Sequence, residues 1–214
     1  MLWQRWIGPW LLALGMALAA GCGAVQQVKS DLGIGDAVID ESAQYQELIK
    51  PYLVKGRIYR NLGTEMLCTA LPLNSKVRRA RVAMMAKAKA MTPEQVRRLL
   101  AEEQKIQERY CEVVLSFYVP DRKSNNLAGL HPDWLVFLVN QEGQRQLPVD
   151  RRRIKRRSAL NQTLYPFWGL WDRLYILRYK RTIKGRSFIK PTDRQVRMLI
   201  TGARGRTVLT LPLR

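Results

Sequence analysis

Histidine, cysteine and acidic residues are scarce in this chain. Its 214 residues include one His, three Cys and 17 Asp or Glu, against 37 Lys or Arg. A single imidazole, that of His131, does not build a zinc site without carboxylates or thiolates beside it, so we predict no metal site and no cofactor. The sequence also lacks Cys-x-x-Cys, His-Glu-x-x-His and Gly-x-Ser-x-Gly motifs and a glycine-rich phosphate loop. These absences favour a protein that is not an enzyme.

One short pattern points the other way. Ser187 and Lys190 match the Ser-x-x-Lys motif of serine enzymes that act on the bacterial cell wall. That chemistry needs the Ser at the start of a helix and the Lys one turn further on. Here the flanking Lys-Gly-Arg and Pro191 are typical of an extended segment or a loop, so we interpret the match as chance.

No apolar run in the chain is long enough to span a membrane. Residues 7–20 carry no charge, but a spanning helix needs about 20 apolar residues. Arg5 precedes the run, and small residues end it. A short positive start, a short apolar stretch and small residues are typical of an export signal.

The segment Leu18-Ala19-Ala20-Gly21-Cys22 resembles the lipobox of bacterial envelope lipoproteins. The resemblance implies that residues 1–21 are a signal peptide, cut before Cys22, and that Cys22 is the site of lipid attachment, by palmitate or another acyl chain. Position 23 is Gly rather than Asp, which under the enterobacterial sorting rule implies an outer-membrane lipoprotein facing the periplasm. An ordinary secretory signal cut near Ala20, or a chance Cys, are the alternatives.

Charge divides the rest of the chain into two parts. Residues 22–47 have five acidic residues, one base and glycines at 33 and 35, which predicts an acidic flexible tether. Residues 48–214 have 35 basic and 12 acidic residues, a net charge of +23. Such a charge governs encounters with anions rather than the fold. We expect anionic lipid, polysaccharide or acidic protein as partners, and no nucleic acid, because export leads to the periplasm; a merely solvated basic surface is the alternative.

Residue periodicity predicts a mainly β fold interrupted once by helices. Alternating or fully apolar segments with turn residues between them indicate about eight strands, at 53–60, 65–73, 112–119, 134–140, 145–157, 174–180, 195–201 and 207–213. Between the second and third of these, residues 76–110 have helical spacing, with Thr92 and Pro93 starting a second helix. We predict an antiparallel two-sheet β-sandwich over residues 48–214 with an inserted helical pair at 76–110.

Lipid attachment at Cys22 would leave an even number of cysteines, Cys68 and Cys111. In an oxidising compartment, two remaining cysteines favour a disulfide between them. Two buried free thiols, which behave as small hydrophobic groups, are the alternative.

Two neighbouring segments are candidate binding sites. The first is basic, and its candidate anion-binding residues are Arg151, Arg152, Arg153, Lys155, Arg156 and Arg157. Its alternative role is that of a solvated edge strand whose like charges block pairing with another chain. The second, Tyr165–Trp171, is aromatic. It either covers an open end of the sandwich and completes the core, or presents an anchor for a partner or a membrane interface, formed by Tyr165, Phe167, Trp168 and Trp171.

These features support two hypotheses of different classes. The first is a non-enzymatic, lipid-anchored binding or scaffold module that holds a protein partner at the outer membrane; in lipobox and architecture alone it is similar to the type VI secretion lipoprotein. The second is an electrostatic binder of anionic lipid, lipopolysaccharide or cell-wall polymer.

Overall fold

The computed structural model describes the backbone of residues 36–214 and the side chains from residue 42 onwards. The predicted signal peptide, the predicted lipid-attachment residue Cys22 and the first part of the predicted tether lie outside the described residues. Within the described part, residues 45–214 form one compact unit. No helix in this part of the chain has both the length and the apolar character needed to cross a membrane.

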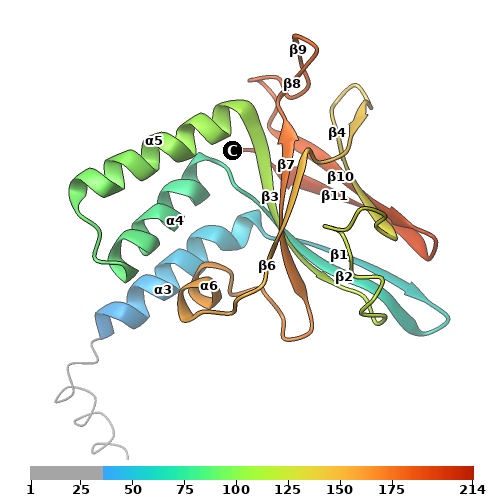
Figure 1. Ribbon diagram of the computed structural model, residues 1–214, viewed down its shortest axis with the longest axis horizontal. Coiled ribbons are helices and arrows are strands. Elements are labelled where there is room, and N and C mark those ends of the chain that lie inside the picture. The colour runs from blue at the N-terminus through green and yellow to red at the C-terminus, as the bar shows by residue number, and fades with distance from the viewer. Residues whose placement is uncertain (1–35) are drawn as a thin grey trace, which may run out of the picture. The chain divides into compact units, whose positions relative to one another are not determined.

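The unit is mainly β, with every strand pair antiparallel, as predicted (Figure 1). One sheet has the spatial order β1 (Val54–Arg60), β2 (Gly63–Pro72), β3 (Tyr110–Tyr118), β7 (Arg173–Lys180) and β6 (Asp150–Ile154). The second has the order β11 (Gly205–Pro212), β10 (Gln195–Gly202), β4 (Trp134–Val139) and β5 (Arg145–Gln146). The short strands β8 (Thr182–Ile183) and β9 (Arg186–Ser187) pair only with each other.

A hydrophobic core joins the inner faces of the two large sheets. Alternate residues of β3, among them Val113, Leu115 and Phe117, are fully buried against residues of the second sheet such as Met198. The Phe117 and Trp134 rings meet edge to face, with their centroids 6.0 Å apart. This confirms the period of two predicted for β3, because every second side chain of a strand points to the same face.

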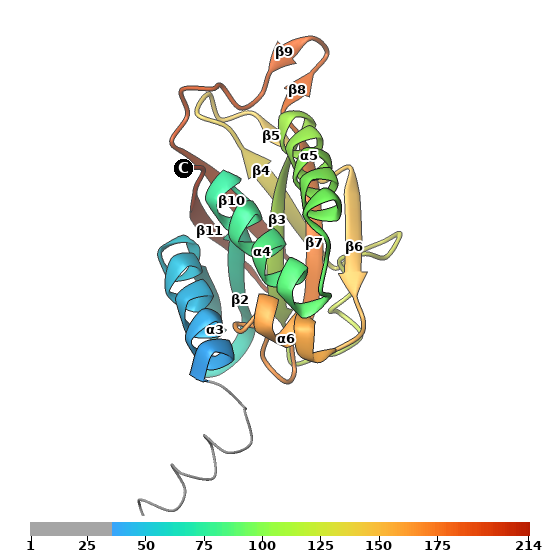
Figure 2. The same ribbon diagram turned by 90° about the vertical axis from the view of Figure 1, so that its left-hand side faces the viewer.

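Helices cover the outer face of the five-stranded sheet (Figures 1 and 2). They are α4 (Ser75–Ala88), α5 (Pro93–Arg109) and α6 (Ala159–Leu164). The predicted helical pair is confirmed, and α5 begins with a capping box in which Thr92 and Gln95 bond each other's backbone N–H groups. Because helices cover one face of this sheet and a second sheet covers the other, β3 and β7 are buried on both faces.

The prediction of a flexible tether reaching Glu47 is wrong from residue 36 onwards, where α3 (Asp36–Ile49) begins. This segment is rich in Ala, Glu and Gln, which favour helix. Tyr45 and Ile49 are four residues apart, lie on one face of the helix and are buried in the same core cluster as residues of α4 and α6. A short 3₁₀ turn, η1 (Lys50–Tyr52), then leads into β1.

The predicted disulfide between Cys68 and Cys111 is absent, and both residues are buried free thiols, which was the alternative. Cys68 lies opposite Phe117 on the neighbouring strand, six residues along β3 from Cys111. At about 3.3 Å per residue this separates the two cysteines by roughly 20 Å, whereas a disulfide needs Cα atoms within about 7 Å. Burial raises the pKa of the Cys68 thiol to about 12 and that of Cys111 to about 11.

Candidate functional site

The basic segment and the aromatic segment line one pocket of about 210 Å³. Arg153, Lys155 and Arg157 contribute from the end of β6 and the residues that follow it. Trp168 and Trp171 contribute from the connection between α6 and β7. The lining is completed by residues of the β3–β4 loop, including Arg122 and Asn125, and by Arg173 at the start of β7.

Part of the basic segment lies on an edge strand. β6 pairs with β7 on one side only, with Arg153 opposite Tyr175, so its other edge has no strand partner within the described residues. This is the position predicted for a charged strand, because like charges discourage pairing with another chain. The remaining candidate anion-binding residues, Arg151, Arg152 and Arg156, do not line the pocket.

The aromatic segment divides between core and surface. Tyr165 and Trp168 are buried in the core between the sheet and the helices, and Phe167 packs against that core. The first interpretation is therefore right for these residues, except that they cover the outer face of a sheet rather than an open end. The prediction that Tyr165 and Trp168 are exposed anchors is therefore wrong. Only Trp171, 69% exposed, keeps the second role, together with Leu170, 82% exposed.

Hydrogen bonds hold the α6–β7 connection in shape. The Trp168 indole Nε1 donates to the backbone oxygen of Asp172 at 3.0 Å. The Asp172 carboxylate accepts from the backbone N of Gly169 at 3.2 Å and from the Ser116 hydroxyl. A Cβ at Gly169 would lie 2.8 Å from Asp172 Oδ2, so a side chain there would push the carboxylate away from the Gly169 backbone N. Leu170 and Trp171 form the tip between these bonded residues.

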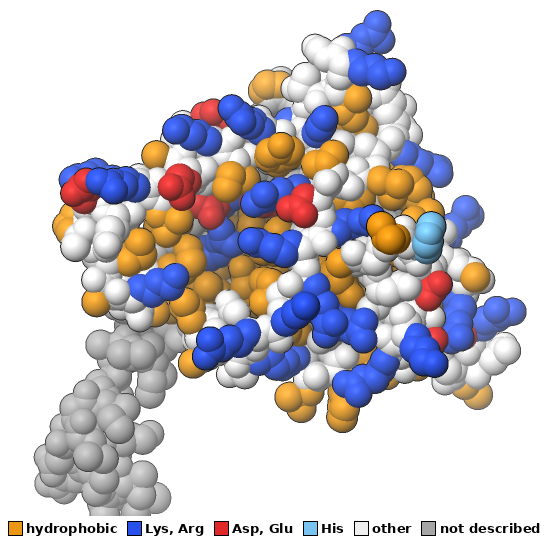
Figure 3. Space-filling view, in the orientation of Figure 1, with side chains coloured by type: hydrophobic (Ala, Val, Ile, Leu, Met, Phe, Trp, Pro, Cys, Tyr) orange, Lys and Arg blue, Asp and Glu red, His pale blue; other side chains and the backbone are white. Residues whose placement is uncertain are grey.

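The pocket has a large excess of positive charge, and Figure 3 shows Lys and Arg side chains gathered on this face. Its lining has five cationic side chains, those of Arg122, Arg153, Lys155, Arg157 and Arg173, and a single carboxylate, that of Asp172.

Two of these arginines are held by their neighbours. The Arg157 guanidinium lies 4.4 Å from the Trp168 ring centroid and donates to the backbone oxygen of Gly169. Arg173 donates to the backbone oxygen of Asn125. The side chains of Arg153 and Lys155, in contrast, form no hydrogen bond or ion pair with any described residue, and that of Arg122 contacts only the Trp171 ring. None of the five cations is neutralised by an ion pair, and these three are the least held by their neighbours.

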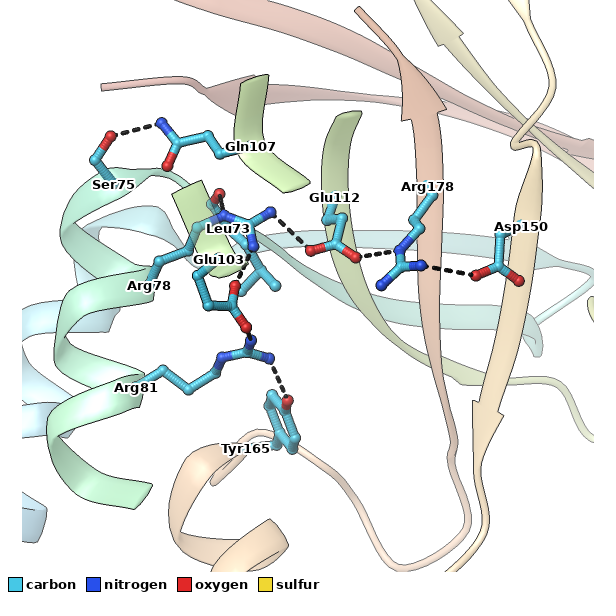
Figure 4. Close-up of polar contacts among 10 residues, drawn as sticks. All are labelled: Leu73, Ser75, Arg78, Arg81, Glu103, Gln107, Glu112, Asp150, Tyr165 and Arg178. Atoms are coloured by element: carbon cyan, nitrogen blue, oxygen red, sulfur yellow. Dashed lines mark hydrogen bonds and ion pairs between the residues drawn. The ribbon is translucent and has the colours of Figure 1, made fainter. Parts of the chain in front are cut away.

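A buried ion-pair network positions both segments of the site (Figure 4). Arg78 and Arg81 of α4 both pair with Glu103 of α5, and the three side chains are at most 10% exposed. Arg81 also donates to the Tyr165 hydroxyl at 3.2 Å, which ties the start of the aromatic segment to the helical pair.

The network continues across the sheet to the basic strand. Glu112 of β3 accepts from Arg78 at 2.7 Å and from Arg178 of β7, and Arg178 pairs with Asp150, the first residue of β6, at 3.6 Å. Burial alone would raise the pKa of Glu112. The hydrogen bonds from Arg178 and Arg78 outweigh that effect and hold the pKa below its ordinary value.

The sequence interpretation missed this network, although a signal was present. In α5 the apolar stripe runs through Val96, Leu99 and Ile106, and Glu103 interrupts that stripe. A carboxylate in an apolar stripe predicts a buried partner, because buried charges require pairing. The identity of the partners depends on a different helix and on strands far along the chain.

The Ser-x-x-Lys match lacks the helical geometry of the serine enzymes. Ser187 ends the short strand β9, and its hydroxyl donates to the backbone oxygen of Ile189 at 2.8 Å. Lys190 pairs instead with Glu142 at 2.7 Å. His131 is exposed in the β3–β4 loop, and the described residues hold no group of three His, Cys, Asp or Glu side chains placed to bind a metal.

Comparison with known proteins adds no relative: no family model matches the chain, and neither the curated proteins nor the solved structures give a significant match. The functional argument therefore depends on the pocket and its surroundings.

Proposed function

We propose that this chain is a non-enzymatic, lipid-anchored protein of the bacterial cell envelope that binds a phosphate-bearing envelope ligand in the basic pocket. The lipobox-like segment supports the anchor at Cys22 and a location at the outer membrane facing the periplasm. The two sheets with their shared core support a sandwich as the architecture of the body. The observation that carries the proposal is the charge of the pocket lining, which has five cationic side chains and one carboxylate.

The chemistry of the lining suits a phosphate group. Arginine guanidinium groups present paired N–H donors that match two phosphate oxygens at once, and lysine adds a compact positive charge. Arg157 is already fixed by its contact with Trp168, so part of the ordering cost of binding is met before the ligand arrives.

The size of the pocket limits the ligand. A pocket for a drug-sized molecule is typically about 300–1,000 Å³. The volume here, about 210 Å³, accommodates one charged headgroup rather than a whole lipid or a length of polymer.

The test is titration of the full acylated chain in non-ionic detergent micelles with pyrophosphate, followed by calorimetry. We expect binding at low salt that weakens steeply towards about 300 mM NaCl, where the Debye length is only about 6 Å. The double variant Arg153→Glu, Lys155→Glu is expected to lose binding. The double variant Lys184→Glu, Arg186→Glu is the matched control, because both residues are exposed in the β8–β9 hairpin, at the opposite end of the unit from the α6–β7 connection (Figures 1 and 2). An absence of binding, or equal losses in both variants, would contradict the proposal.

The anchor has its own test. Cells that express the chain are labelled with radioactive palmitate, and the label is expected in the wild type and absent from Cys22→Ala. A labelled Cys22→Ala chain, or an unlabelled wild type, would contradict the proposed lipid attachment.

A second candidate function is a scaffold that holds a protein partner, comparable to the type VI secretion lipoprotein in its proposed anchoring and architecture. The exposure of Leu170 and Trp171 favours this role, because exposed apolar tips are typical anchors of protein interfaces. Crosslinking in intact envelopes tests it. A specific envelope partner that stays bound at high salt and is lost in Trp171→Ala would support it, and salt-sensitive capture alone would count against it.

A further inference from the structure

We propose that Leu170 and Trp171 insert into the interfacial region of an anionic phospholipid bilayer while the phosphates of neighbouring headgroups enter the basic pocket. This inference rests on the proposed function, since it identifies the source of the phosphate that the pocket binds.

The tip has the character of an interfacial anchor. Leu170 and Trp171 are consecutive, large and apolar, and they are 82% and 69% exposed. Isolated exposed apolar residues are common on soluble proteins, but an adjacent Leu-Trp pair at the end of a turn is a local concentration. Tryptophan favours the bilayer interface, where its ring is partly apolar and its N–H remains hydrated.

The tip is already ordered. Trp168 on one side is buried and hydrogen-bonded to Asp172 on the other, and Gly169 donates to the same aspartate. These contacts fix both ends of the two-residue tip, so Leu170 and Trp171 stay presented to the outside. Insertion therefore orders little additional chain, which lowers the entropic cost of binding.

The surroundings of the tip complement an anionic surface. The Arg122 guanidinium lies 5.9 Å from the Trp171 ring centroid, and Arg153 and Lys155 line the same pocket without an ion pair among the described residues. Each Lys or Arg near an anionic bilayer strengthens binding about fivefold. Long basic side chains also reach the headgroup phosphates from residues placed beside an inserted apolar tip.

The same arrangement is a poorer match to a protein surface. The buried centre of a protein interface is depleted in charge, whereas this tip has several cations directly beside it. A bilayer interface accommodates both groups at once, with apolar side chains at the level of the acyl chains and cations at the level of the phosphates. Figure 3 shows hydrophobic side chains protruding among basic ones where the α6–β7 connection lies.

The experiment uses the full acylated chain reconstituted into two kinds of vesicle, one of phosphatidylcholine and one containing about one third phosphatidylglycerol. The lipid anchor tethers the chain equally to both, so a difference between them reports the contribution of headgroup charge. Tryptophan emission is recorded for the wild type and for Trp171→Phe, and the difference between the two isolates Trp171. Acrylamide measures exposure to water, and brominated acyl chains measure depth.

In the anionic vesicles we expect Trp171 emission to shift to the blue, to be quenched by the brominated chains and to be protected from acrylamide. The double variant Arg153→Glu, Lys155→Glu should lower the ratio of inserted to exposed tip by at least about 25-fold, since two cations are lost. Leu170→Ser should lower it about tenfold. The double variant Lys184→Glu, Arg186→Glu is the charge control, and Leu62→Asn removes an even more exposed leucine from the β1–β2 turn at a positive φ that asparagine tolerates. Both controls should behave as the wild type.

Two outcomes overturn the inference in distinguishable ways. If pyrophosphate binds the micellar chain but Trp171 stays equally open to acrylamide in both vesicles, insertion is wrong and phosphate binding stands. If pyrophosphate does not bind either, the proposed function fails with it. Protection of Trp171 that requires another envelope protein would assign the tip to a protein partner instead.

Discussion

A large effect on stability is expected from the replacement of Glu103 by alanine. The Glu103 carboxylate pairs with both Arg78 and Arg81, and the exposed fractions of the three side chains are 10%, 3% and 10%. Its removal leaves two guanidinium groups in a site with little access to water. Arg78 keeps its pair with Glu112, but Arg81 keeps only the hydrogen bond to Tyr165.

The expected size follows from the cost of an uncompensated buried charge. Removal of one partner from a buried ion pair typically costs about 3–5 kcal/mol. Because Arg78 retains Glu112, the lower end is appropriate, and we expect Glu103→Ala to lower the free energy of unfolding by about 3 kcal/mol. With a urea dependence of about 2 kcal/mol per molar, this shifts the unfolding midpoint down by roughly 1.5 M.

A second glutamate on the same helix supplies the control. Glu94 also pairs with an arginine, Arg98, but the two side chains are 63% and 74% exposed. An exposed pair of this kind contributes well under about 1 kcal/mol, so Glu94→Ala should leave the midpoint nearly unchanged. Urea unfolding of both variants, followed by circular dichroism, makes the comparison. Equal midpoints would refute the reasoning, because they would mean that burial of the network carries no energetic weight.

The remaining predictions concern pH, thiol chemistry and packing. Hydrogen bonds hold the pKa of Glu112 in the folded chain below its ordinary value, so the ionised carboxylate stabilises the fold. This stabilisation is present above the pKa of the unfolded state and is lost as pH falls through the pKa of the folded state. In urea unfolding at a series of acidic pH values, the stability advantage of the wild type over Glu112→Gln should therefore shrink as pH falls, and a constant difference would contradict this. Cys68 and Cys111 should resist maleimide near neutral pH in the folded chain and react in urea, as mass spectrometry would show; rapid labelling of the native chain would contradict their burial. In Gly56→Ala the new Cβ would lie 2.7 Å from Leu209 Cδ2. We therefore expect the free energy of unfolding, measured in urea, to fall by about 1–3 kcal/mol, with pyrophosphate binding unchanged. An unchanged unfolding midpoint would show that the contact relaxes.

Some features of the fold follow from short stretches of sequence. The start of α5 at Thr92 and Pro93 depends on residues within one helical turn, and the capping box forms as predicted. The face of β3 that packs against the second sheet depends only on alternation along one strand, which placed Cys111 and Val113 on the same side. The β1–β2 hairpin was also predictable, with its turn at Asn61 and Leu62, which both have positive φ.

The candidate site was predictable only in part. The sequence showed that the basic and aromatic segments were close along the chain, and the structure places members of both around one pocket. It did not reveal that Tyr165 and Trp168 are buried while Trp171 is exposed. Alternation cannot separate these residues, because Pro166 and Gly169 break any regular period in the segment.

The sequence alone determined the basic character of the body, the antiparallel strands and the helical pair, because charge, alternation and capping act over a few residues. Tertiary structure decided whether the two cysteines meet, which carboxylates pair with arginines and which aromatic residues reach the surface. Cys68 and Cys111 are on neighbouring strands, yet the strand register keeps them apart. Glu103 and Arg78 are 25 residues apart, yet the packing of α4 against α5 joins them. Register and packing are set by the whole core at once, so no local pattern encodes them.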